Sequence, residues 1–97
     1  MATNVTATPN NYVNVHGAQT NNVHSGACVL QSVVVNTPGT LCTVYDSTSG
    51  SGSVVAIINT ATSVPGTTAV YNVKCSKGIT VVTTGAATDI TVTYGSL

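Results

Sequence analysis

Residues branched at Cβ dominate this sequence and limit its possible folds more than any other feature. Seventeen Val and eighteen Thr make up more than a third of the 97 residues, whereas Glu, Arg, Phe and Trp are absent. Val and Thr are stiff at χ1 and fit a pleated strand better than a helix. No stretch of a dozen residues has helical periodicity. The composition therefore predicts an all-β protein, and the length predicts one domain.

Clusters of Gly, Pro, Asn and Ser separate the apolar runs at intervals of roughly a dozen residues, as in small β-sandwiches. Seven strands are predicted, at approximately 11–16, 27–35, 40–46, 53–59, 67–75, 79–84 and 89–94. Pro38 and Gly39 predict a type II turn between two of them. Residues 1–10 are polar and do not alternate, so we expect an N-terminal arm followed by a single domain over 11–97. The predicted fold is a small antiparallel β-sandwich, jelly-roll-like, of about seven strands.

Alternation of apolar and polar residues is clearest near the C-terminus. In residues 89–94, Ile90, Val92 and Tyr94 fall on one face and polar residues on the other, which is the period-two pattern of a half-buried strand. Residues 67–75 alternate in a similar way. Both segments are therefore expected to cover one side of a hydrophobic core.

Two runs, at 33–35 and 54–58, are apolar at every position. A strand that is apolar on both faces indicates that its outer face is also covered, either by a loop of the same chain or by a neighbouring subunit. The residues that we expect in a subunit interface are Val33, Val34, Val35, Val54, Val55 and Ile57.

Charge is nearly absent, with two Lys, two Asp and a formal net charge of zero. Two lysines cannot neutralise a phosphate backbone, so we expect no nucleic-acid binding. The longest apolar run, 54–58, is far shorter than a membrane-spanning helix, and the N-terminus lacks the features of a signal peptide, so we expect no membrane partner and no secretion.

So few charges oppose association of the chain with itself only weakly, and a core without Phe or Trp leaves little surplus stability. A homo-oligomer is therefore expected.

The sequence has three cysteines and two histidines, and these residue types often bind metals. Cys28, Cys42 and Cys75 include no CxxC pair, and we expect buried thiols that act as small hydrophobic side chains; a disulfide or a zinc site is the alternative. His16 and His24 flank a Gly-, Asn- and Gln-rich connection, and we expect two solvated loop histidines. The alternative is a metal shared between subunits if the connection folds back. The sequence thus predicts no metal and no cofactor.

No set of residues predicts catalysis. Asp46 and Asp89 are the only acidic residues. A His-based catalytic triad therefore has only these two candidates for its carboxylate, and a glycosidase carboxylate pair has no further acid to shift its pKa values. Asp46 begins a Ser- and Gly-rich loop at 47–52, where calcium loops would carry further carboxylates. We expect Asp46 to accept backbone N–H bonds and start the loop turn, and we expect no enzyme activity.

Several segments of residues 10–97 resemble those of small Val- and Thr-rich structural proteins of tailed-bacteriophage virions. They are 36–40, 43–52, 71–73, 77–85 and 89–94. These segments follow a fixed order, with a tight turn first and then a Tyr-Asp pair with a Ser/Gly loop. The ending begins with Lys-Gly-Ile and closes on Ile-Thr-Val-Thr-Tyr. This order is most similar to that of capsid decoration (cement) proteins.

This resemblance implies a compact β-sandwich or jelly-roll module, commonly trimeric, that binds the major capsid protein and reinforces the outside of the capsid. The chain would be made in the host cytoplasm and work on the virion surface. The arm, with Thr3, Asn4, Val5 and Thr6, is expected to contact the capsid or a neighbouring subunit. The alternative is a β-module of a head or tail fibre that takes part in host attachment.

Overall fold

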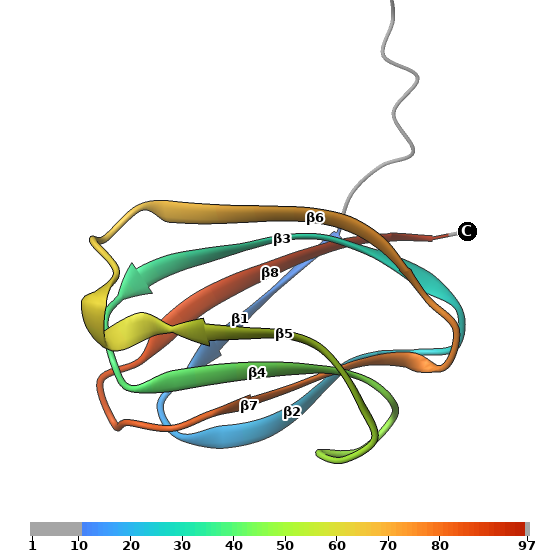
Figure 1. Cartoon of the computed structure of the whole chain (residues 1–97), viewed down its shortest axis with the longest axis horizontal. Coiled ribbons are helices and arrows are strands. Elements are labelled where there is room, and N and C mark those ends of the chain that lie inside the picture. The colour runs from blue at the N-terminus through green and yellow to red at the C-terminus, as the bar shows by residue number, and fades with distance from the viewer. Residues whose placement is uncertain (1–10, 97) are drawn as a thin grey trace, which may run out of the picture.

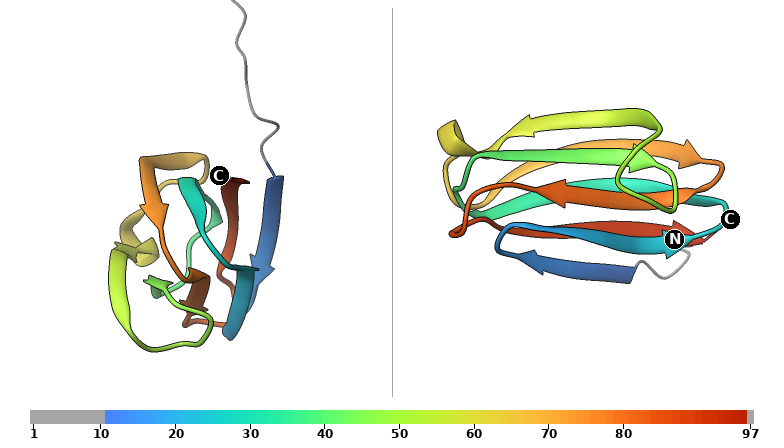
Figure 2. Two further views of the ribbon diagram at one scale, coloured as in Figure 1. Left: turned by 90° about the vertical axis from the view of Figure 1, so that its right-hand side faces the viewer. Right: turned by 90° about the horizontal axis from the view of Figure 1, so that it is seen from below.

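Two four-stranded antiparallel sheets pack face to face in the computed structural model, which describes residues 11–96 (Figures 1 and 2). The strands are β1 (Asn11–His16), β2 (Gln19–Ser25), β3 (Cys28–Thr37), β4 (Leu41–Asp46), β5 (Ser53–Asn59), β6 (Thr67–Cys75), β7 (Gly78–Thr83) and β8 (Asp89–Ser96). A single 3₁₀ turn, η1 (Thr60–Thr62), follows β5. One sheet has the order β1-β8-β3-β6 and the other β2-β7-β4-β5. The predicted fold class, an antiparallel β-sandwich, is confirmed.

The strand pairing is that of a long antiparallel hairpin rolled into two layers. The first strand pairs with the last, β2 with β7, β3 with β6 and β4 with β5. Pairing of β3 with β8 and of β4 with β7 then closes each sheet. Eight strands connected in this way form a jelly roll. In the left view of Figure 2, β1 and β2 lie on one side of the sandwich and β5 and β6 on the other.

The predicted strand count is corrected from about seven to eight, because residues 19–25 form β2. The sequence predicts a Gly-, Asn- and Gln-rich connection here, and Val23 is the only apolar residue of β2. Its backbone nevertheless pairs with β7 along its length, and Val23 contributes to the core. β2 is an edge strand, so most of its side chains face solvent. His16 and His24 consequently lie in strands rather than in a loop.

One continuous core fills the space between the sheets. Val15, Leu30, Val44, Val81 and Val92 are fully buried in it, and they come from both sheets. The alternation predicted for 89–94 is confirmed, since Ile90 and Val92 are buried and Tyr94 packs against the core, while Asp89, Thr91 and Thr93 are partly exposed. All three cysteines are free and buried in this core, as expected.

A bulge in β3 sets which valines reach the core. The pairing of β3 with β6 and with β8 shifts between Leu30 and Ser32, so the alternation changes phase at Gln31. Leu30 points inward before the bulge and Val33 and Val35 point inward after it. The three consecutive valines at 33–35 therefore form an ordinary half-buried strand rather than one covered on both faces by another subunit.

Glycine occupies positions where a side chain would not fit, and Gly39 and Gly78 are the two most crowded. Gly78 has φ +149°, and a Cβ there would lie 2.5 Å from the carbonyl oxygen of His24. A Cβ on Gly39 would overlap the side chain of Thr88. Gly39 does not have positive φ, which corrects the predicted type II turn at Pro38 and Gly39. Gly39 is needed there because of the close approach of Thr88.

Candidate interaction surface

The two histidines lie apart and have different neighbours. His16 ends β1 and its Nδ1 lies 3.2 Å from the Asp89 carboxylate. His24 lies on β2, and its ring centroid is 5.3 Å from that of Tyr94. Among residues 11–96 the structure contains no pocket and no group of three or more His, Cys, Asp or Glu residues that could hold a metal ion.

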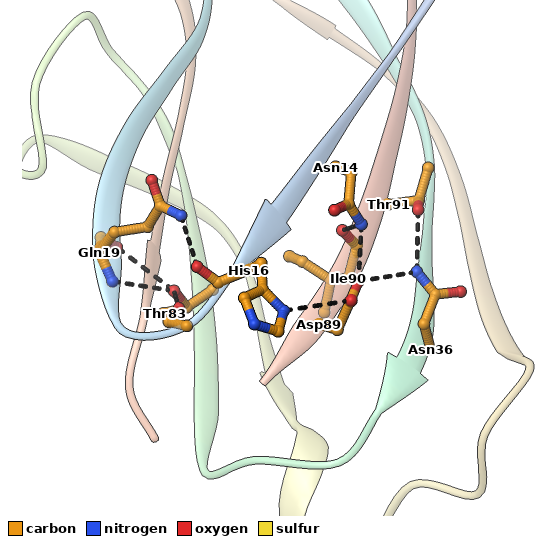
Figure 3. A network of polar contacts seen from close by, with 9 residues as sticks. Asn14, His16, Gln19, Asn36, Thr83, Asp89, Ile90 and Thr91 are labelled. Atoms are coloured by element: carbon orange, nitrogen blue, oxygen red, sulfur yellow. Dashed lines mark hydrogen bonds and ion pairs between the residues drawn. The ribbon is translucent and has the colours of Figure 1, made fainter. Parts of the chain in front are cut away.

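Asp89 is the centre of a polar network on the outer face of the β1-β8-β3-β6 sheet (Figure 3). Its carboxylate accepts hydrogen bonds from the side-chain amides of Asn14 at 2.6 Å and Asn36 at 3.1 Å, in addition to the contact with His16. The hydrogen bond from Asn14, followed by that from Asn36, holds the pKa of Asp89 below its usual value. Asn36 also donates to Thr91 Oγ1 at 2.9 Å. The network thus ties three neighbouring strands together through side chains.

This network contains a histidine and a carboxylate, which are two members of a hydrolase triad, but it lacks the nucleophile. A triad needs a hydroxyl or thiol hydrogen-bonded to the histidine. No Ser, Thr or Cys side chain of residues 11–96 is hydrogen-bonded to His16, whose side chain is 70% exposed. The arrangement is suited to holding strand register.

Asp46 binds a turn that is distant in sequence. Its carboxylate accepts hydrogen bonds from the backbone amides of Ser76 and Lys77, between β6 and β7, and of Gly78, the first residue of β7. The amide of Lys77 contributes most to lowering the pKa of Asp46. The expectation that Asp46 accepts backbone N–H bonds is confirmed, but the amides belong to this distant turn and not to the loop that Asp46 begins.

The loop at 47–52 covers part of the outer face of the β2-β7-β4-β5 sheet. Thr80 Oγ1 donates to the carbonyl oxygen of Ser47 at 2.9 Å. A Cβ on Gly50 would lie 3.1 Å from methyl groups of Thr20 and Val82. Thr80 is fully buried as a result. A loop of the same chain therefore covers this outer face over β2 and β7, but not over the apolar run at 54–58, where Val54 and Ile57 are exposed.

Exposed apolar side chains concentrate on the side of the sandwich formed by β5, β6 and their connection, here called the β5/β6 side. Five of the seven large hydrophobic residues exposed in residues 11–96 lie there. They are Val54, Ile57, Val64, Val70 and Val73. Ile57 is 64% exposed and Val70 68%. Ile57 and Val70 lie on the outer faces of different sheets, and the β5/β6 side, which holds most of these residues, is the candidate interaction site.

Both strands of the β5/β6 side have an unpaired edge. β5 is hydrogen-bonded only to β4, and β6 only to β3, within the described part of the chain. Such edges expose backbone N–H and C=O groups that can pair with another strand. Lys74 is the one charged residue on these two strands. The usual protection of an edge by several charges is therefore weak here.

The structure divides the predicted interface residues into three groups. Val33 and Val35 are 0% and 2% exposed in the core of the single chain, so they cannot contact a partner, and the prediction is corrected for them. Val34 is half-buried, opposite Thr68 and Thr91, and Val55 packs against the core. Of the predicted interface residues, only Val54 and Ile57 are exposed on the β5/β6 side. The predicted contact residues Thr3, Asn4, Val5 and Thr6 lie outside the described residues.

Sequence reasoning missed Val64, Val70 and Val73 as surface residues. For Val70 a signal was available, because it occupies the otherwise polar face of the alternating segment 67–75, beside Thr68 and Asn72. An apolar residue at a polar position of an alternating strand is expected to be exposed. Val73 is 37% exposed because β6 is an edge strand, which only the strand order shows.

No known protein family, curated protein or solved structure matches this chain. In the part of the chain that the structure describes, no helix is both long and apolar enough to cross a membrane.

Proposed function

We propose that this chain is a structural virion protein that binds the outside of a phage capsid as a homotrimer and reinforces the shell, in the manner of a decoration or cement protein. The observation that carries the proposal is the β5/β6 side, where exposed apolar side chains and two unpaired strand edges occur together. The jelly-roll order adds support, since this architecture recurs in viral capsid proteins. The sequence resemblance to decoration proteins provides the assignment to a phage capsid.

Subunits of the proposed trimer contact one another through the β5/β6 side. A three-fold axis beside this side would bring the β5 and β6 edges of each copy, with their exposed apolar side chains, close to its neighbours. Burying them is favourable in proportion to the apolar area removed from water. A chain with net charge zero adds little repulsion between identical copies.

The capsid is bound through uncharged hydrogen-bonding groups. The outer face of the β1-β8-β3-β6 sheet carries such groups on its central strands, where Ser32 and Thr93 are hydrogen-bonded to each other at 2.6 Å and Asn36 binds Thr91. Three identical weak sites on one rigid body gain affinity through effective concentration. The proposal involves no catalytic step and no cofactor, and the major capsid protein is the partner.

Light scattering on purified protein tests the trimer. The wild-type chain is expected to be trimeric at micromolar concentration, and V70K is expected to be monomeric, because it places a charge in the proposed contact. Y12K is the matched control, since Tyr12 is 72% exposed on β1, the opposite edge of the same sheet. A monomeric wild type, or equal dissociation by both variants, would count against the proposal.

Capsid binding needs a second measurement. Sedimentation with purified capsids is expected to retain the wild-type trimer and to lose most of the monomeric V70K. A cryo-EM map of the particle separates the proposal from the alternative, a module of a head or tail fibre for host attachment, because a cement protein occupies sites over the whole shell.

A further inference from the structure

Cys28 of β3 and Cys75 of β6 are directly opposite each other in the antiparallel pairing of these strands. Both are free thiols and fully buried. The pair lies where β6 ends, next to the turn that Asp46 binds. The only other cysteine, Cys42, lies on β4 in the second sheet, opposite Ile58 and Thr83.

The position of Cys28 and Cys75 satisfies the main geometric requirement for a disulfide. Directly opposite residues of antiparallel strands have Cα atoms about 4.5 to 5.5 Å apart. Disulfides join cysteines whose Cα atoms are about 4.4 to 6.8 Å apart. Packed sheets are about 10 Å apart, so Cys42 is too distant from either of them for a disulfide without backbone movement.

We propose that Cys28 and Cys75 are a disulfide site, which is reduced while the chain folds and is closed by a disulfide oxidant such as glutathione disulfide. One thiolate attacks the oxidant, forms a mixed disulfide and releases one glutathione thiolate. The second thiolate then attacks the mixed disulfide, forms the bond between Cys28 and Cys75 and releases the second glutathione thiolate. The protein loses two electrons and two protons, and one glutathione disulfide becomes two glutathione molecules.

The surroundings keep this reaction slow at neutral pH. Burial, with a further contribution from the nearby Asp46 carboxylate, raises the pKa of Cys28 and raises that of Cys75 to about 11. Attack requires the thiolate, so few molecules are reactive at any moment. The reagent enters when the end of β6 opens, and edge strands open at lower cost than central ones. Oxidation should therefore accelerate as the pH rises from about 7 to 9.

The proposed bond would fasten an edge strand to the centre of its sheet. It links β6, whose other edge is unpaired, to β3, which has partners on both sides. The closed segment contains β4, β5 and most of β3 and β6. Closing a long loop stabilises the folded state mainly by restricting the unfolded chain. The melting temperature of the oxidised protein is expected to be higher by about 5 °C or more.

Tryptic mapping after oxidation tests the proposal, because the only Lys residues, Lys74 and Lys77, flank Cys75. The folded protein is incubated with glutathione disulfide at about pH 8.5, where thiolates form more readily, and remaining thiols are alkylated before digestion. The expected product is the tripeptide 75–77 joined to fragment 1–74, and reduction is expected to release it. Free thiol titration is expected to fall from three groups to one.

Two variants identify the partner of Cys75. C42A is expected to form the linked product at the wild-type rate, whereas C28A is expected not to form it. Circular dichroism establishes that each variant is folded before oxidation. The proposal is overturned if three thiols persist in the wild type, if only mixed glutathione disulfides accumulate, or if C28A gives as much linked product as C42A.

Discussion

The Asp46 carboxylate accepts a hydrogen bond from the backbone amide of Lys77 at 2.8 Å, although the two residues are 31 positions apart in sequence. Asp46 ends β4, and Lys77 lies in the turn between β6 and β7. One side chain therefore connects the end of a strand in one sheet to the turn by which the chain leaves the other sheet. Three amides of this turn bind the same carboxylate.

Removing the Asp46 carboxylate should destabilise the fold through this turn. D46A leaves three backbone amides without their acceptor, and we expect the free energy of unfolding to fall by about 1 to 3 kcal/mol. D46N keeps one oxygen acceptor and should lose less. Urea denaturation of the three proteins measures both differences. Equal stability of D46A and wild type would show that water replaces the carboxylate at no cost.

Acid is expected to lower the stability of the fold by protonating only two side chains. The pKa values of Asp46 and Asp89 are lowered from 3.8, mainly by the Lys77 amide and by Asn14 respectively. A lowered folded pKa means that the stabilisation is present above the unfolded value and is lost as the pH falls through the folded value. We expect the wild-type stability to decline below about pH 5 and to level off once both carboxylates are protonated.

The matched control for acid sensitivity is the double variant D46N/D89N, which removes every side-chain carboxylate of the sequence. Its stability is expected to be lower than that of the wild type at pH 7 and nearly constant down to about pH 2. Urea midpoints at several pH values provide the comparison. A decline as steep as that of the wild type would assign the effect to another group, such as the C-terminal carboxyl.

Gly78 should tolerate no side chain. In G78A the Cβ would lie 2.5 Å from the His24 carbonyl oxygen at a φ of +149°, so backbone must move in β2 or β7. We expect a loss of at least about 2 kcal/mol. G66A is the control, because Gly66 also has positive φ, at +91°, but no atom lies within 4 Å of the added Cβ. The control should lose only about 1 kcal/mol from strain, and a smaller loss in G78A than in G66A would contradict the explanation.

Much of this fold is predictable from the sequence because side-chain alternation reports which face of a strand is buried. The segment with Ile90 and Val92 is the clearest example. β2 escaped prediction since its side chains are mostly polar and its pairing with β7 is made by backbone groups. Val33 and Val35 were assigned to an interface because the bulge at Gln31, which fixes the phase of β3, leaves no trace in composition.

The candidate surface was less predictable than the fold because exposure on an edge depends on strand order. Ile57, which was predicted to lie in a subunit interface, is exposed on the single chain. Val64 lies in the connection between η1 and β6, and Val73 is exposed on β6, which ends its sheet. No local pattern encodes the order of distant strands. A run of apolar residues indicates that the residues are buried. Only the arrangement of the strands determines whether they are buried in the core of the chain or against a partner.

The core should depend on its largest buried side chain far more than on an exposed one of the same type. Leu30 is fully buried between the sheets, so L30A should leave a cavity and lose about 2 to 5 kcal/mol. Leu41 is 40% exposed, and L41A should lose less than about 1.5 kcal/mol. Thermal and urea denaturation of both variants make the comparison. Similar losses would mean that the two leucines are equally buried in solution.

Thr80 should be the residue that holds the loop at 47–52 against the outer face of its sheet. Its buried hydroxyl donates to the Ser47 carbonyl oxygen at 2.9 Å and accepts from the Asn22 side-chain amide at 3.0 Å. T80V keeps the shape but removes both hydrogen bonds, so we expect a loss of about 1 to 2 kcal/mol and faster hydrogen exchange in the loop. T43V is the control, because Thr43 lies half-buried on β4 and no hydrogen bond of its hydroxyl occurs within residues 11–96. If T43V and T80V increase loop exchange equally, the loop is held by its contacts with Thr20 and Val82 rather than by the Thr80 hydroxyl.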